Sequence, residues 1–244
     1  MEKSNKLYLI IIITCTVLVI GLCVFAIANR KDTKVSDAIK FKEEYEAYNG
    51  LVNESVDKNY LDVDIDSENP MIYKTGKEIV DVLKNETAIV YFGFATCPWC
   101  RNTIGPLLKA AKDEGIDKIY YVDIYDIRDT YKFTGSIVPE QTKKGTDAYY
   151  EILKFLGDNL EEYYVKDESG NMYDTGVTRL YAPTVVAVKD GKVLDLHEST
   201  LDSQTDPYVA LTGDQKDELT DIFQKLMQKT KDNKTVCSDS DDAC

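Results

Sequence analysis

The chain has 244 residues, 43% of them hydrophobic and 10% aromatic, so it has enough apolar side chains for a packed core and is not disordered throughout. Its length fits one domain of ordinary size with an anchor and some extensions. The formal net charge of -14 would repel a phosphate backbone, and no basic stripe with interleaved aromatic residues offsets it. We therefore expect no nucleic-acid partner.

An almost unbroken apolar run occupies residues 7–28, behind an N-terminal flank of residues 1–6. As a helix the run is long enough to cross a hydrocarbon core of about 30 Å, which predicts a transmembrane anchor. Ala26 and Ala28 leave a cleaved signal peptide as the alternative, but the run exceeds the roughly 7–15 apolar residues typical of one. The short flank and the cysteines beyond the run predict a single-pass protein of the cell membrane with an extracytoplasmic soluble domain.

Residues 29–69 are polar and acidic, and we interpret them as a stalk leading into the domain. Within the stalk, a short helix is expected over 36–48 and a strand over 60–65. The domain itself is predicted over residues 70–231, and an acidic tail follows over 232–244.

A β-α-β pattern begins the domain. The capping-box spacing of Thr75 and Glu78 predicts a first helix, and the β-branched and aromatic run 87–94 predicts a strand buried on both faces. A second helix is expected over 98–114, and residues 119–124 form another buried strand. The helical crossover requires these two strands to be parallel.

The second half of the domain begins with an insertion over approximately residues 128–178, in which the apolar spacing of 146–165 predicts a helix. Residues 184–196 give a strong hairpin signal, because Asp190-Gly191 suits a tight primed turn. A last amphipathic helix is expected to start near Gly213.

The six cysteines fall into three settings: Cys15 and Cys23 in the apolar run, Cys97 and Cys100 in the domain, and Cys237 and Cys244 in the tail. The first pair is interpreted as small hydrophobic residues, since the sequence around Cys23 fits a lipoprotein cleavage site poorly. The tail pair could close a small disulfide, serve as a second redox pair or do nothing, and an oxidising compartment favours the disulfide. Only the middle pair indicates chemistry.

The stretch Cys97-Pro98-Trp99-Cys100 follows a buried strand and begins a helix, where open α/β sheets place their functional groups. A dithiol exchanges disulfides when one sulfur is exposed and ionised while the other waits within bonding distance. At the N-cap, Cys97 would be stabilised as a thiolate by unpaired N–H groups, with Cys100 one turn behind it. Pro98 fits the first helical turn without loss of a hydrogen bond.

Two other interpretations of the pair remain open, a structural zinc site and inert thiols. Zinc would need further ligands, for which only His197 and the tail cysteines Cys237 and Cys244 are candidates. We interpret His197 as a surface or hydrogen-bonded histidine, and we expect neither a metal nor a bound cofactor.

Residues 91–102 (YFGFATCPWCRN), together with Ala182-Pro183-Thr184 before a hairpin, resemble the thioredoxin superfamily over approximately residues 70–230. The first stretch is similar to the membrane-anchored thioredoxin-like proteins of Gram-positive bacteria, including the bacteriocin transport accessory proteins. The resemblance implies an α/β thioredoxin-like fold with a central mixed sheet flanked by helices and a helical insertion before a cis-proline. It also implies that Pro183 is that cis-proline and faces the dithiol, and that the backbone of Ala182 pairs with a substrate strand.

The sequence departs from the family in two places. Many thioredoxins carry a buried aspartate six residues before the first cysteine, where this chain has Tyr91, a poor base near neutral pH. The distance from Asp123 to Pro183 also exceeds the family spacing, because it contains the insertion.

These observations predict an enzyme, a thiol–disulfide oxidoreductase in which Cys97 and Cys100 form the redox-active disulfide and Pro98 and Trp99 adjust thiolate stability. Its partners would be a protein or peptide disulfide and a second redox protein. The alternative is a non-catalytic accessory module that uses the same fold to hold a secreted peptide or a transporter.

Overall fold

A computed structural model describes residue 16 and residues 35–231 of the chain. The predicted acidic tail, the predicted transmembrane run apart from Thr16, and the four cysteines Cys15, Cys23, Cys237 and Cys244 lie outside these residues. Among the described residues, no helix combines the length and the apolar character that a membrane crossing requires.

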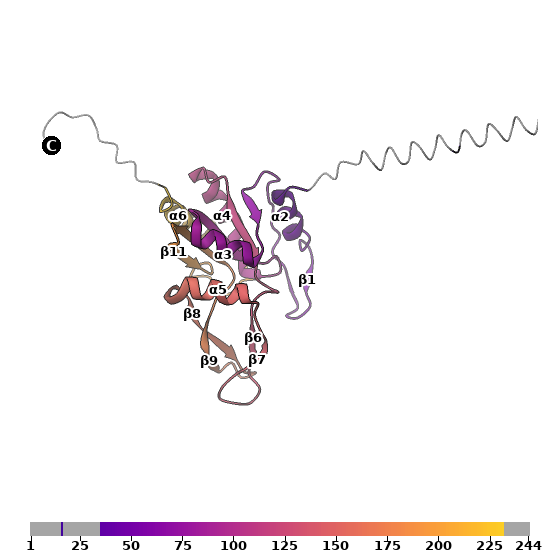
Figure 1. The fold of residues 1–244 in the computed structure, drawn as a ribbon. Helices are drawn as coiled ribbons and strands as arrows, with labels where there is room; N and C mark the ends of the chain where they lie inside the picture. The colour runs from indigo at the N-terminus through magenta and orange to yellow at the C-terminus, as the bar shows by residue number, and fades with distance from the viewer. Residues whose placement is uncertain (1–15, 17–34, 232–244) are drawn as a thin grey trace, which may run out of the picture. The chain divides into compact units, whose positions relative to one another are not determined.

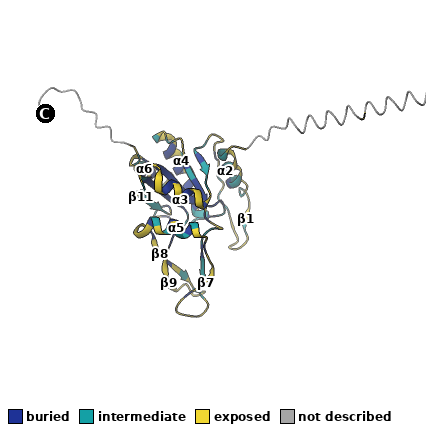
Figure 2. Cartoon of the chain, viewed as in Figure 1, coloured by how far each residue is buried: buried dark blue, intermediate teal, exposed yellow. Residues whose placement is uncertain are grey.

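A five-stranded mixed sheet lies at the centre of the domain, in the order β11-β10-β4-β5-β3. Figure 1 shows its edge strand β11 beside α6 (Gly213–Gln228). The strands are β3 (Met71–Tyr73), β4 (Ala88–Gly93), β5 (Ile119–Asp123), β10 (Thr184–Lys189) and β11 (Lys192–Glu198). Strands β3, β4 and β5 are parallel, whereas β10 runs antiparallel to both β4 and β11. Every residue of β4 is buried, which explains its continuous apolar sequence. Figure 2 shows a different pattern on α3 (Gly76–Asn85) and α5 (Asp147–Leu156), where buried and exposed residues alternate.

Helices cover both faces of this sheet, as the α/β prediction requires. They are α2 (Asp37–Glu46), α3 (Gly76–Asn85), α4 (Pro98–Glu114), α5 (Asp147–Leu156) and α6 (Gly213–Gln228). Helix α3 connects β3 to β4 and α4 connects β4 back to β5, so the two right-handed crossovers place them on opposite faces. Helix α5 packs beside α3 and α6 beside α4, and α2 lies against β3.

The segment before β3 contributes to the core, although the sequence analysis interprets it as a stalk. The side chains of Phe41 and Tyr45 on α2 are fully buried and lie against the ring of Tyr121. A short hairpin of β1 (Val52–Asn53) and β2 (Lys58–Asn59) follows. The strand expected over 60–65 is absent, because side chains from the end of α2 and the turn after it take up the backbone hydrogen bonds that a neighbouring strand would make.

The insertion is only partly helical, so the prediction of a helix over 146–165 is wrong in its second half. The insertion contains a hairpin of β6 (Thr130–Lys132) and β7 (Glu140–Lys143), then α5, the 3-10 turn η1 (Gly157–Asn159), and a hairpin of β8 (Glu161–Lys166) and β9 (Met172–Arg179). Gly157 ends the helix with a positive φ of 51°. Leu160 and Tyr163 keep the helical spacing only because they pack inward from the turn and the strand beyond it.

Two local predictions are confirmed. Thr75 and Glu78 form a reciprocal capping box at the start of α3. Asp190 and Gly191 adopt φ values of 50° and 71° between β10 and β11, as a primed hairpin turn requires.

Candidate active site

Cys97 lies at the N-cap of α4, a short turn after β4 ends. Its backbone is extended, with φ -77° and ψ 118°, and its Sγ accepts a hydrogen bond from the Cys100 N–H at 3.4 Å. Pro98 fills the first helical turn, where its missing N–H would have had no partner within the helix. The sulfur of Cys97 therefore lies at the positive end of the helix, as the motif predicts.

Opposing influences set the pKa of the Cys97 thiol. Burial is the largest and raises the pKa, since Cys97 is only 5% exposed. Hydrogen bonds from the Cys100 side chain and from the N–H groups of Cys100 and Trp99, with the charge of Arg128, act in the other direction. Together they outweigh burial, so the pKa of Cys97 lies below its ordinary value. The sulfur is thus poised to ionise, but Cys97 is much less exposed than the motif alone suggests.

Cys100 lies deeper in the same helical turn and is fully buried. The two cysteine side chains approach to 3.2 Å, and both are free thiols. Burial first, and then the hydrogen bond and charge of Cys97, raise the pKa of Cys100 well above its ordinary value. Within the pair, Cys97 is therefore the sulfur that ionises and Cys100 the one that keeps its proton.

Ala182 and Pro183 reach the dithiol from the loop before β10, and the peptide bond between them is cis. The Cys97 Sγ–H donates a hydrogen bond to the carbonyl oxygen of Ala182 at 3.3 Å. The Pro183 carbonyl in turn accepts a hydrogen bond from the Ser199 N–H at 2.8 Å, which anchors the loop to the end of β11. Residues far apart in the sequence therefore meet at one sulfur atom.

Trp99 is half-buried and lines a cavity of about 560 Å³ with the segment that follows β11. His197 lies in this cavity wall, and its Nε2 atom pairs with the carbonyl oxygen of Thr200 at 2.8 Å. The prediction that His197 is a hydrogen-bonded histidine is therefore confirmed. Glu198, the next residue, also lines this cavity.

Arg128 is a site residue that the sequence analysis does not identify. It follows β5 and begins the insertion, and its guanidinium lies 4.7 Å from the ring centroid of Phe94 and 5.7 Å from that of Tyr125. Its positive charge lowers the pKa of Cys97. The available signal was its place just after the carboxyl end of a parallel strand, beside the strand that leads to the dithiol.

Arg101, the residue after the dithiol, fastens the start of α4 to the N-terminal segment. Its Nη1 donates to the carbonyl oxygens of Tyr45 at 2.8 Å and Ala95 at 3.1 Å. Its Nε donates to the Leu61 carbonyl at 2.5 Å, and its Nη2 donates to the Asn49 side chain at 2.6 Å. The guanidinium is buried and holds the start of α4, which carries the dithiol, against the N-terminal segment.

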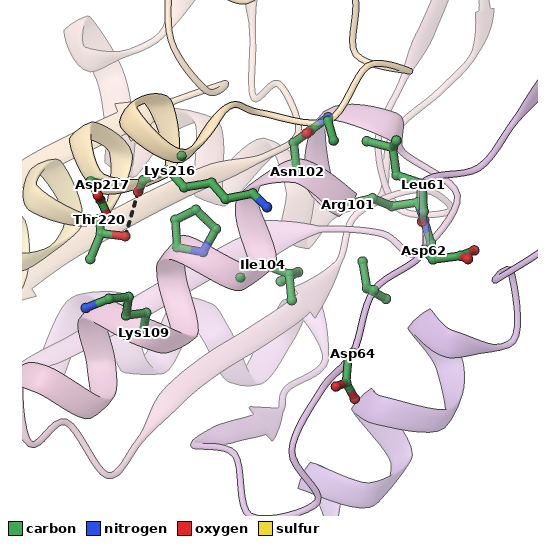
Figure 3. Close-up of a pocket in the computed structure, with 15 residues that line it drawn as sticks. Leu61, Asp62, Asp64, Arg101, Asn102, Ile104, Lys109, Lys216, Asp217 and Thr220 are labelled. Carbon is green, nitrogen blue, oxygen red and sulfur yellow. Dashed lines mark hydrogen bonds between the residues drawn. The ribbon is translucent and has the colours of Figure 1, made fainter.

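A separate pocket of about 520 Å³ lies on the far side of Arg101, between α4, α6 and the extended segment 61–64 (Figure 3). Arg101 and Asn102 reach its wall, but neither cysteine lines it. The dithiol is therefore not part of this pocket.

No protein-family model matches the chain, and no curated protein is similar to it.

Proposed function

We propose that this chain is a thiol–disulfide oxidoreductase of thioredoxin-like fold that acts on protein or peptide disulfides through Cys97 and Cys100. The observation that carries the proposal is a pair of thiols 3.2 Å apart whose pKa values move in opposite directions. One sulfur is ready to attack while the other waits as a thiol beside it. The electrons pass between sulfur atoms, so the reaction itself calls for no bound cofactor.

The reaction has two exchange steps. The Cys97 thiolate attacks a substrate disulfide, a bond forms between Cys97 Sγ and one substrate sulfur, and the other substrate sulfur leaves as a thiolate. Cys100 Sγ then attacks Cys97 Sγ, the bond to the substrate breaks, and the second substrate sulfur leaves and takes up the proton of Cys100. The substrate is reduced and the pair is oxidised. The reverse sequence oxidises a substrate dithiol, and the reduction potentials of the partners set the direction.

Substrate binding is assigned to the loop that holds Ala182 and Pro183. The cis peptide bond and the contact between Cys97 Sγ and the Ala182 carbonyl support this assignment. An extended substrate segment would pair with the Ala182 backbone and displace the Cys97 thiol from that carbonyl. The five-stranded mixed sheet with helices on both faces supports the thioredoxin-like fold.

The proposal includes a single-pass membrane anchor over residues 7–28 and an extracytoplasmic domain. The apolar character of the run supports the anchor. An oxidising compartment would supply disulfide substrates and a redox partner.

The test uses the full chain in detergent with a peptide disulfide as substrate. The Cys97→Ser variant should lose exchange by at least about 10³-fold, because the nucleophile is gone. The Cys100→Ser variant should instead accumulate a mixed disulfide with the peptide, visible by mass spectrometry under non-reducing conditions. If Cys97→Ser exchanges disulfides as fast as the wild type, the proposal is wrong.

The low exposure of Cys97 favours one alternative, a non-catalytic module that holds a secreted peptide or a transporter. The double variant Cys97→Ser, Cys100→Ser separates the two functions in the host cell. A module keeps its full biological activity in this variant, whereas an oxidoreductase loses it while remaining folded.

A further inference from the structure

Tyr91 lies directly beneath the dithiol, at the position where the sequence departs from the family. It is a fully buried residue in the middle of β4, paired with Val185 on one neighbouring strand and Tyr121 on the other. Its hydroxyl makes a side-chain hydrogen bond with Cys100. A phenol therefore contacts the deeper of the two sulfurs.

Gly93 is the residue that gives the phenol this position. Residues two apart on a strand share a face, so the Tyr91 ring leans over Gly93 toward the end of the strand. A Cβ atom at Gly93 would come within 2.4 Å of the Tyr91 Oη. The glycine in this otherwise apolar strand is required for the approach of the hydroxyl to the helix start.

Tyr45 completes a chain of two hydroxyls. Its Oη lies 2.9 Å from the Tyr91 Oη, and both residues are fully buried. Tyr45 comes from α2, and its carbonyl oxygen is one of those that accept from Arg101. The segment before the sheet thus delivers a hydroxyl to the interior of the site and is fixed there by the residue next to Cys100.

The protonation state of the two phenols makes them hydrogen-bond donors. Burial, followed by the charge of Cys100, raises the pKa of Tyr91 well above 10.0, and burial does the same for Tyr45. Both hydroxyls therefore stay protonated over the pH range in which thiols exchange, and a protonated phenol offers its O–H to a sulfur that is gaining negative charge. A second hydroxyl that donates to the first strengthens this bond.

We propose that Tyr91 and Tyr45 form a two-hydroxyl donor chain that stabilises the Cys100 sulfur during disulfide exchange. Tyr91 touches a reacting atom and is a catalytic residue, whereas Tyr45 is a positioning residue that holds the Tyr91 hydroxyl toward the sulfur. This inference rests on the proposed function, because Cys100 must attack or leave for the chain to act.

The affected step is the attack of Cys100 Sγ on the mixed disulfide. A bond forms between the two cysteine sulfurs, the bond from Cys97 to the substrate breaks, and the substrate sulfur leaves with the electron pair and takes the Cys100 proton. Negative charge gathers on Cys100 as that proton departs, and the Tyr91 O–H donates to this charge throughout. Both phenols end the step with their own protons.

Dithiobis(nitrobenzoate), a small aromatic disulfide, separates this step from the first. Attack by Cys97 on the reagent releases one coloured thiolate, and attack by Cys100 releases the second, so stopped-flow absorbance with the reduced full chain follows each sulfur in turn. Tyr91→Phe should slow the second release by roughly 10-fold or more and Tyr45→Phe by a smaller factor, with the first release unchanged. The pH midpoint of the second release should move upward in both variants.

Tyr121→Phe is the matched control. Tyr121 stacks on Tyr91 and is fully buried, but its hydroxyl donates to Glu44 Oε1 at 3.0 Å instead of to a sulfur. The inference fails if Tyr91→Phe and Tyr45→Phe release the second thiolate as fast as the wild type, or if Tyr121→Phe slows it equally. If the wild type itself never releases a second thiolate, the proposed function fails, and the inference falls with it.

Discussion

The surroundings of Cys97 and Cys100 differ although the two sulfurs share one helical turn. Around Cys97, backbone N–H groups at the helix start and the charge of Arg128 point toward the sulfur. Around Cys100, burial is complete and the neighbours are Cys97 and the phenol of Tyr91. Burial raises both pKa values, but only Cys97 has enough donors to reverse the effect. The count and direction of donors, rather than depth alone, decide which sulfur ionises.

Removing the Arg101 side chain, which fastens the start of α4, should have the largest effect of these substitutions on stability. Arg101→Met removes a buried guanidinium that donates to three backbone carbonyls and one side chain. We expect the free energy of unfolding to fall by about 3 kcal/mol or more, because four hydrogen bonds of one buried charged group are lost together. Chemical denaturation of the two proteins measures the difference.

Lys109→Met is the control for this substitution, since it removes an exposed cation from the same helix. Its effect should be much smaller than that of Arg101→Met, because the cation and its partner Asp113 are both solvent-exposed. Equal losses in both variants would show that the Arg101 hydrogen bonds do not matter for stability.

The comparison of the two thiols also predicts selective alkylation. At pH 7, iodoacetamide should label Cys97 at least about 100-fold faster than Cys100, because only thiolates react and the pKa of Cys97 is lowered while that of Cys100 is raised. Brief labelling of the reduced chain followed by peptide mass spectrometry gives the ratio. Comparable labelling of both cysteines would contradict the assignment of Cys97 as the ionised sulfur.

Removing the charge of Arg128 tests its effect on the pKa of Cys97. Arg128→Gln should raise the pKa of Cys97, because a positive charge no longer favours the thiolate. Thiolate absorbance against pH measures the shift. Lys112→Gln, at the other end of α4, removes the same charge far from the sulfur and should leave the pKa of Cys97 where it is.

The pKa of the Glu198 carboxyl group, like the pKa values of the two thiols, depends on burial and on the groups around it. Burial, and then the neighbouring Glu161, raise its pKa to about 7, while the Tyr181 N–H alone opposes them. The folded state therefore holds a proton between the ordinary pKa of 4.5 and about 7 that the unfolded state has lost, so stability falls as pH rises through this window. Above it, Glu198→Gln should stabilise the protein by about 1 kcal/mol, a figure discounted for partial solvent screening.

Thermal unfolding of Glu198→Gln and the wild type at pH 5 and at pH 8 checks this expectation. The stabilisation should be larger at pH 8, where the buried carboxylate of the wild type is charged. Glu168→Gln, at an exposed position in the turn between β8 and β9, is the control for the loss of one carboxyl group from the surface. A gain that is equal at both pH values would contradict the raised pKa of Glu198.

Local sequence patterns determined the elements that carry the dithiol. The apolar run before Cys97, Pro98 at the helix start and the Asp190-Gly191 turn each act over a few neighbouring residues, so their structures follow from local preference and hydrophobic pattern. The second half of the predicted helix over 146–165 failed for the converse reason. Pairing between β8 and β9 overrode the helical spacing there, and the partner strand β9 lies beyond the segment whose spacing predicted the helix.

What the tertiary structure alone decided is the set of groups that meet at the two sulfurs. Arg128 and Tyr45 come from two distant segments, and their local sequence does not show which atoms of the site they contact. The sequence by itself determined that a dithiol begins a helix after a buried strand. Which charges and hydroxyls surround each sulfur depends on packing between segments, and so does the depth at which each sulfur is buried.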